Sequence, residues 1–189
     1  MPEPADTGLD KRAEQIRALH EARAGVELAA ADAAAPGSDR VAWRGSLMAG
    51  VMLVKGLPGP AEASGGSAMS GADGEALGKA LEALGWNEGD AFHTLSRPNP
   101  DIDAVRRAER LRLQAEAVDP QVVVALDTDA AVDLAHAFGL PELKPGRVLV
   151  AGGRRLLAVE GFEASLGDER AKRRVWSQLK HAVPDGPVY

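Results

Sequence analysis

The chain contains no cysteine among its 189 residues. This absence excludes disulfide bonds, cysteine-ligated zinc, thiolate-bound iron–sulfur clusters and thiol nucleophiles. Aromatic residues are also scarce, at 4% of the sequence, so leucine, valine, alanine and isoleucine must build most of the core. We therefore expect aliphatic packing, and no covalent or metal cross-link, to stabilise the fold.

Positive charge and long apolar runs are scarce as well. The 22 Lys and Arg residues face 28 Asp and Glu residues, which gives a net charge of -6. This sign disfavours tight non-specific binding of nucleic acid, because such binding needs cations that neutralise phosphates. The apolar stretch from Gly45 to Val54 is too short to span a bilayer, and the acidic start of the chain does not resemble a secretory signal. We expect a cytoplasmic protein with no membrane partner.

The composition is otherwise that of one globular domain, with 45% apolar and 26% charged residues. We expect this domain over residues 9–183, between a flexible N-terminus (1–8) and a C-terminal tail (184–189). Helical and strand-like stretches alternate along it. Helices are expected at 8–23, 72–84, 99–118, 129–138 and 168–181, and strands at 47–54, 91–95, 121–126, 147–151 and 154–159.

This alternation predicts a three-layer α/β/α sandwich with a central, mostly parallel, four-stranded sheet. The last two strands flank Gly152-Gly153, which is typical of a tight hairpin. Ligands of such folds bind beyond the carboxyl ends of the strands, so four loops matter: 55–70, 96–101, 127–129 and 160–168. The loop 55–70 holds four glycines and two prolines, and we expect it to be the most mobile part of the domain.

Motifs in this first loop resemble the uracil-DNA glycosylase superfamily, and most closely its thermostable branch, which normally carries an iron–sulfur cluster. That branch has Val-Gly-Glu-Ala-Pro-Gly after its first strand, and then Gly-x-Pro-Phe-Val-Gly-x-Ala-Gly before a Leu-rich helix. The corresponding segments here are Val54-Lys-Gly-Leu-Pro-Gly59 and Gly66-Ser-Ala-Met-Ser-Gly-Ala-Asp-Gly74. Two later segments, 118–126 and 166–179, are similar to the family in the same order. The resemblance spans residues 9–181 and implies the fold of that family.

The resemblance also places the family's functional positions on residues of other chemistry. Gly56 stands where the family has the acid that positions water, and Met69 where it has the Phe that stacks on uracil. Leu95 replaces the Asn that reads the base edge, and the His-Pro-Ser motif falls on Gly161, Phe162 and Glu163. The remaining pocket positions that match the motifs are Leu57, Pro58, Gly59 and Gly71.

These losses bear on the same reaction. Cleaving an N-glycosidic bond needs a carboxylate or activated water for the oxocarbenium-like transition state, and a donor for the departing base. A leucine at position 95 would also leave polar atoms of the base unpaired. We therefore expect a uracil-DNA glycosylase-like protein without glycosylase activity, which acts as a binding or accessory module. Its partner would be nucleic acid or a nucleobase, bound weakly, or another protein.

Two alternatives remain open at this point. The first is a divergent glycosylase or hydrolase whose catalytic residues have moved to Glu62, His93 or Glu163. The second is an interaction protein unconnected to nucleic acid. Arg170, Arg173 and Arg174 share a helix face that could contact a DNA backbone, although such a face is more often merely solvated.

We expect no metal site and no cofactor, because the histidines form no His-x-x-x-His pair or larger ligand cluster. The region that an iron–sulfur cluster would hold in the family must then be packed by apolar side chains. The candidates for this packing are Leu9, Ile16, Val26 and Leu28.

Overall fold

The computed structural model describes residues 8–33, 40–99 and 101–182. Within them the chain forms a mixed α/β structure, as expected from the alternation of its sequence patterns. The predicted tail (184–189) and all but the last residue of the predicted flexible N-terminus (1–8) lie outside the described residues. No described helix is long and apolar enough to cross a membrane.

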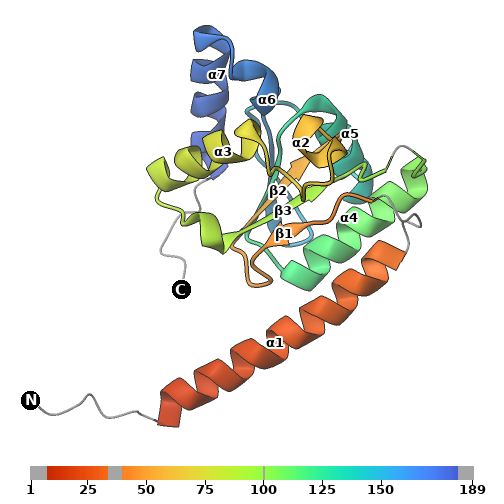
Figure 1. The fold of residues 1–189 in the computed structure, drawn as a ribbon, viewed down its shortest axis with the longest axis vertical. Coiled ribbons are helices and arrows are strands. Elements are labelled where there is room, and N and C mark those ends of the chain that lie inside the picture. Colours follow the sequence, from red (N-terminus) through yellow and green to blue (C-terminus); the bar gives the residue numbers. More distant parts are fainter. Residues whose placement is uncertain (1–7, 34–39, 100, 183–189) are drawn as a thin grey trace, which may run out of the picture.

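A six-stranded sheet in the order β1-β3-β2-β4-β6-β5 forms the centre of the molecule (Figure 1). Its four inner strands are parallel: β3 (Ala91–Leu95), β2 (Val51–Lys55), β4 (Val122–Ala125) and β6 (Arg154–Ala158). The prediction of a four-stranded sheet misses the antiparallel edge strands β1 (Arg44–Gly45) and β5 (Leu149–Ala151). Strand β1 has only two residues, which is too short to give a recognisable strand pattern in the sequence. Strand β5 belongs to the predicted hairpin, which is confirmed by its antiparallel pairing with β6 and by positive φ angles at Gly152 and Gly153.

Helices cover both faces of this sheet, so its inner strands are apolar on both sides. Met52 and Val54 of β2 face one cluster, which includes α4 (Ala104–Val118) and α5 (Thr128–Ala137). Val51 and Leu53 face the other cluster, which includes α3 (Ala72–Ala83) and α7 (Glu169–Leu179). The short elements are α2 (Pro60–Ala63), α6 (Phe162–Ser165) and two 3₁₀ turns, Glu88–Asp90 and Lys180–Ala182.

The first helix, α1 (Gly8–Ala33), is ten residues longer than the stretch 8–23 indicates. Its C-terminal half packs beside α4, and Leu28 is fully buried in the core (Figure 1). Three of the side chains expected to pack there do not: Leu9, Ile16 and Val26 are 73%, 69% and 72% exposed. The prediction that four apolar side chains of this helix pack against the domain is therefore confirmed for Leu28 and wrong for the other three.

The loop after β2 is hydrogen-bonded to its surroundings at several points. It contains the helix α2, and the buried Glu62 accepts backbone hydrogen bonds from Gly59 and Met69 (3.0 and 2.8 Å). The guanidinium group of Arg44 holds the end of the loop from outside, because it donates to the carbonyl oxygens of Ala68 and Met69. The loop therefore has fixed points that the sequence pattern does not reveal.

Two helical glycines should respond in opposite ways to alanine. Nothing lies within 4 Å of a Cβ atom placed on Gly25 in α1, so Gly25→Ala should raise the free energy of unfolding by about 0.5–1 kcal/mol. A Cβ atom on Gly74 in α3 would overlap the carbonyl oxygen of Met69, so Gly74→Ala should lower it by about 1–3 kcal/mol. Urea denaturation measures both changes, and a neutral Gly74→Ala would show that this close approach does not exist.

Candidate functional site

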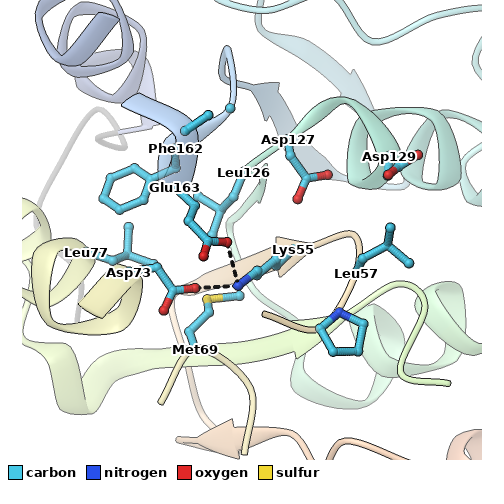
Figure 2. A pocket seen from close by; sticks show the side chains of 13 residues that line it. Lys55, Leu57, Met69, Asp73, Leu77, Leu126, Asp127, Asp129, Phe162 and Glu163 are labelled. Atoms are coloured by element: carbon cyan, nitrogen blue, oxygen red, sulfur yellow. Dashed lines mark hydrogen bonds and ion pairs between the residues drawn. The ribbon is translucent and has the colours of Figure 1, made fainter. Parts of the chain in front are cut away.

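A cavity of about 440 Å³ lies beyond the carboxyl ends of β2, β4 and β6. Apolar side chains form much of its wall, and charged groups from the end of β2 and from the N-terminal turns of α3, α5 and α6 converge on it (Figure 2). This is the edge of a parallel sheet at which ligands bind, and the volume suits a small organic molecule. The lining residues are Lys55, Leu57, Pro58, Met69, Asp73, Leu77, Leu126, Asp127, Asp129, Gly161, Phe162, Glu163 and Ala164.

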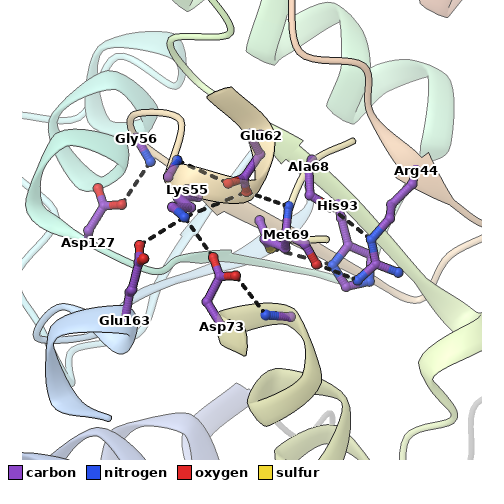
Figure 3. A network of polar contacts seen from close by, with 12 residues as sticks. Arg44, Lys55, Gly56, Glu62, Ala68, Met69, Asp73, His93, Asp127 and Glu163 are labelled. Carbon is purple, nitrogen blue, oxygen red and sulfur yellow. Dashed lines mark hydrogen bonds and ion pairs between the residues drawn. The ribbon is translucent and has the colours of Figure 1, made fainter. Parts of the chain in front are cut away.

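Lys55, the last residue of β2, is the only cation of this lining, and three carboxylates surround it. Its Nζ atom lies 2.6 Å from Asp73 Oδ2, 2.8 Å from Glu163 Oε2 and 3.6 Å from Glu62 Oε1 (Figure 3). The first two contacts join β2 to α3 and α6. Asp73 and Glu62 are buried, whereas the Glu163 side chain is 48% exposed.

The protonated form of Lys55 is strongly favoured. Burial alone would lower the pKa of its ammonium group, but the hydrogen bonds to Asp73 and Glu163 and the charges of Asp73 and Glu62 outweigh burial. The net result is a pKa above the ordinary value of 10.5. Lys55 is therefore a fixed positive charge at neutral pH, and not an amine nucleophile, which would need a lowered pKa.

Asp127 and Asp129 occupy the space next to Gly56. A Cβ atom on Gly56 would lie 2.5 Å from Asp129 Cβ and 2.7 Å from Asp127 Oδ1. The two oxygens of Asp127 accept hydrogen bonds from the backbone N–H groups of Gly56 and Ala130, both at 2.8 Å. Asp127 thereby caps the N-terminus of α5. Asp129 forms an ion pair with Arg97 at 2.8 Å.

Met69 lies at the position where the resemblance implies an aromatic ring. Its φ angle is +53°, a left-handed conformation that is uncommon for a side chain of this kind. Hydrogen bonds on both of its backbone groups hold this conformation: Glu62 accepts from its N–H, and Arg44 donates to its carbonyl oxygen. Its sulfur lies 3.4 Å from His93 Nδ1 (Figure 3). A thioether there fills volume but offers no flat face to a base.

His93 is fully buried, and its Nε2 atom has no hydrogen-bond partner. Burial, and then the nearby positive charge of Arg44, lower the pKa of this imidazole to about 3. His93 is therefore neutral at physiological pH. It also lies outside the lining of the cavity.

The structure separates the predicted site residues into two groups. Six of them line the cavity: Leu57, Pro58, Met69, Gly161, Phe162 and Glu163. The others lie behind the wall or elsewhere. Leu95, 1% exposed, packs with Val41 and Ala68, while Gly71 caps the start of α3. Gly59 lies against Lys55 and the carboxylates around it, since a Cβ atom on Gly59 would be 2.8 Å from Lys55 Nζ.

The predicted basic face lies on α7, where Arg170, Arg173 and Arg174 are all exposed. Arg174 forms an ion pair with Glu160 at 3.0 Å. None of the three arginines lines the cavity. In the part of the chain that the structure describes, no three His, Cys, Asp or Glu residues come close enough together to hold a metal ion.

Four polar residues of the cavity were not singled out by motif: Lys55, Asp73, Asp127 and Asp129. The sequence did carry a signal for two of them, because Lys55 and Asp127 come directly after the predicted strands 47–54 and 121–126, at the edge where ligands bind. Asp73 gave no such signal, because its position on the first turn of α3 brings it to Lys55 only in the folded chain.

Comparison of the chain with protein-family models and with curated protein sequences finds no match. The assignment of a function therefore rests on the residues of the cavity and on the resemblance of the loop motifs.

His93 should make stability depend on pH below neutrality. The unfolded histidine binds a proton below pH 6.5, whereas the folded one remains neutral until about pH 3. The free energy of unfolding should therefore fall as the pH drops below 6.5, by up to about 1.4 kcal/mol per unit from this group. Denaturant titrations of the wild type and His93→Leu between pH 7.5 and 4 isolate the effect, because acid protonates the carboxylates of both. Parallel curves would show that His93 titrates normally in the fold.

Proposed function

We propose that this chain is a uracil-DNA glycosylase-like protein that lacks glycosylase activity and binds a small ligand in the cavity at the sheet edge. The resemblance of the segments 54–59 and 66–74 supports the first part. The parallel strand order β3-β2-β4-β6, with helices on both faces, is compatible with it. The preformed cavity supports the second part.

The observation that carries the proposal is that the polar groups of the site are already used by the protein itself. Lys55 is neutralised by Asp73 and Glu163. Both oxygens of Asp127 accept backbone N–H groups, and Glu62 does the same behind the wall. General acid–base catalysis needs a group that can gain or lose a proton at the substrate. Groups held in this way stabilise the wall of the cavity and are poorly placed to react.

The catalytic groups of the family that this chain lacks also support the absence of glycosylase activity. A departing uracil anion needs a hydrogen-bond donor, and position 161 offers only the backbone of a glycine with a φ angle of +65°. A carboxylate at position 56 would collide with Asp127 and Asp129. These two carboxylates fill the space of the family's acid, but their oxygens already hold the N-terminus of α5 and Arg97.

The charges of the cavity indicate the class of ligand. Four carboxylates and one ammonium group line the cavity, so the electrostatic potential inside it is negative, even though Arg97 lies beside Asp129. A phosphate or a carboxylate would be repelled. Glu163 and Asp129 have internal partners, but their side chains are 48% and 44% exposed, so a protonated amine or amidine on a flat apolar body could share one of them and cover Leu57 and Phe162. We infer that the ligand is a small, cationic or amino-bearing ring.

One observation favours a second candidate, a hydrolase that uses Glu163. This is the most exposed carboxylate of the cavity, with 48% of its side chain accessible, and it adjoins the apolar wall. A hydrolase would lose its activity in Glu163→Gln, whereas a binding module has none to lose. The excision assay below separates the two candidates for glycosidic substrates.

We expect no excision of uracil by the unmodified protein. The measurement is strand cleavage of a uracil-containing oligonucleotide after alkali, with a heat-killed control. Gly56→Glu and Gly161→His should each remain inactive, since the loss of one such group typically costs about 10²–10⁴ in rate and several are missing together. Turnover by the wild type that disappears in Glu163→Gln would overturn the proposal and establish the hydrolase.

The cavity should prefer cations to anions of the same shape. Benzamidine should bind at least about ten times more tightly than benzoate, measured by changes in backbone amide shifts on titration, because only benzamidine can pair with the excess carboxylates. Glu163→Gln should weaken benzamidine binding several-fold. The control Glu116→Gln on α4, a carboxylate of similar exposure away from the cavity, should leave it unchanged. Tighter binding of benzoate would refute the inferred ligand class, and binding of neither probe would refute a binding function for this cavity.

A further inference from the structure

Helix α1 carries an apolar stripe that no other part of the described residues covers. The stripe consists of Leu9, Ile16, Leu19 and Val26, each between 69% and 73% exposed. The face that packs against the body of the protein is different and holds Ala24, Leu28 and Ala31. At 100° per residue, the centre of the stripe lies roughly 120° around the helix from that face. A second helix could therefore lie on the stripe without meeting the body of the protein.

The N-terminal half of α1 has little support of its own. Every residue from Gly8 to Leu19 is exposed, and this part of the helix extends beyond the other elements (Figure 1). Isolated helices shorter than about 12–15 residues are marginal in water, because packing supplies most helical stability. A partner that covers the stripe would provide the missing packing.

The spacing of the stripe is that of a coiled coil. The intervals from Leu9 to Ile16 and from Leu19 to Val26 are both seven residues, and Ile16 and Leu19 are three apart. In a heptad, Leu9 and Ile16 then take position a, while Leu19 and Val26 take position d. These are the two positions whose side chains interdigitate between paired helices.

The stripe is complementary to itself under a twofold rotation. An axis between residues 17 and 18 places Leu9 opposite Val26 of a second copy, and Ile16 opposite Leu19 of that copy. Each a position thus meets a d position, as in an antiparallel pair, and no apolar residue of the stripe is left without a counterpart. A closed, isologous contact of this kind is the commonest symmetry of soluble oligomers.

We propose that two copies of this chain associate through α1 as an antiparallel helix pair about this axis. Arg12 and Arg23 occupy the remaining d and a positions between these residues, and the same rotation places Arg12 opposite Arg23 of the second copy, so two of the six layers bring like charges together. Arg23 already pairs with Glu27 of its own helix at 2.7 Å, so its charge is partly balanced. The aliphatic stems of both arginines can cover the apolar contact while their charged ends remain in water.

The area is adequate for a dimer of modest stability. Each large aliphatic side chain removes on the order of 100 Å² from water when it is buried. Eight such side chains from two helices, with the flanking arginine stems and alanines, reach roughly 1,000–1,200 Å², the lower end of specific interfaces. We therefore expect a dimer that dissociates on dilution.

The oligomeric state of the full chain tests the proposal. Sedimentation equilibrium should give a monomer–dimer equilibrium for the wild type. The double variant Ile16→Glu/Leu19→Glu should be monomeric with an unchanged near-ultraviolet spectrum, because both side chains are exposed. The control Val105→Glu/Val132→Glu alters two exposed valines on α4 and α5 and should dimerise as the wild type does. A monomeric wild type at millimolar concentration, or a dimer that survives Ile16→Glu/Leu19→Glu, would overturn the proposal.

The absence of native cysteine makes a test of orientation direct. Leu9→Cys and Val26→Cys, one of them carrying a mass tag, should form a disulfide with each other after mixing and mild oxidation. Neither variant should form one with itself, because the antiparallel pair separates the two Leu9 positions by about the length of the stripe. Self-linked Leu9→Cys without the mixed product would indicate parallel helices and refute the twofold arrangement.

Discussion

The ammonium group of Lys55 is the charge around which the sheet edge is assembled. Glu62, Asp73 and Glu163 come from three separate segments, and without a cation between them their negative charges would repel one another. Two of these carboxylates are buried, and a buried charge without a partner costs several kcal/mol. The loop after β2, the first turn of α3 and the short helix α6 are therefore held in one arrangement by a single side chain at the end of β2.

The same group of contacts extends behind the cavity wall. Glu62 lies near Lys55 on one side and accepts the backbone N–H of Met69 on the other, which helps to hold Met69 in its left-handed conformation. Met69 in turn places its sulfur against the buried His93. A chain of short contacts thus connects a charged cluster at the ligand edge with a neutral histidine in the middle of β3.

Regular elements were predictable because hydrophobic period and turn residues are local properties. The apolar runs predicted the bounds of β2, β3 and β4 to within a few residues, and Gly152-Gly153 predicted the hairpin. Phe162 and Glu163 lie in the loop 160–168, which was expected at the ligand edge of the sheet, and both line the cavity. Asp73 could not be foreseen, because its meeting with Lys55 depends on the packing of α3. The exposure of Leu9 and Ile16 could not be foreseen either, because an apolar stripe does not indicate whether its cover lies within the same chain.

The crowding beside Gly56 limits which substitutions the chain can tolerate. Asp127 and Asp129 fill the volume that a side chain at position 56 would need, and Asp127 also fixes the start of α5. A mutation that introduces a carboxylate at position 56 would collide with Asp127 and Asp129. Replacing Asp127 first would remove the cap of α5. Single steps in either direction are disfavoured, so the residues at 56, 127 and 129 can change only together. Steric contact therefore restricts substitution at these three positions independently of any role in function.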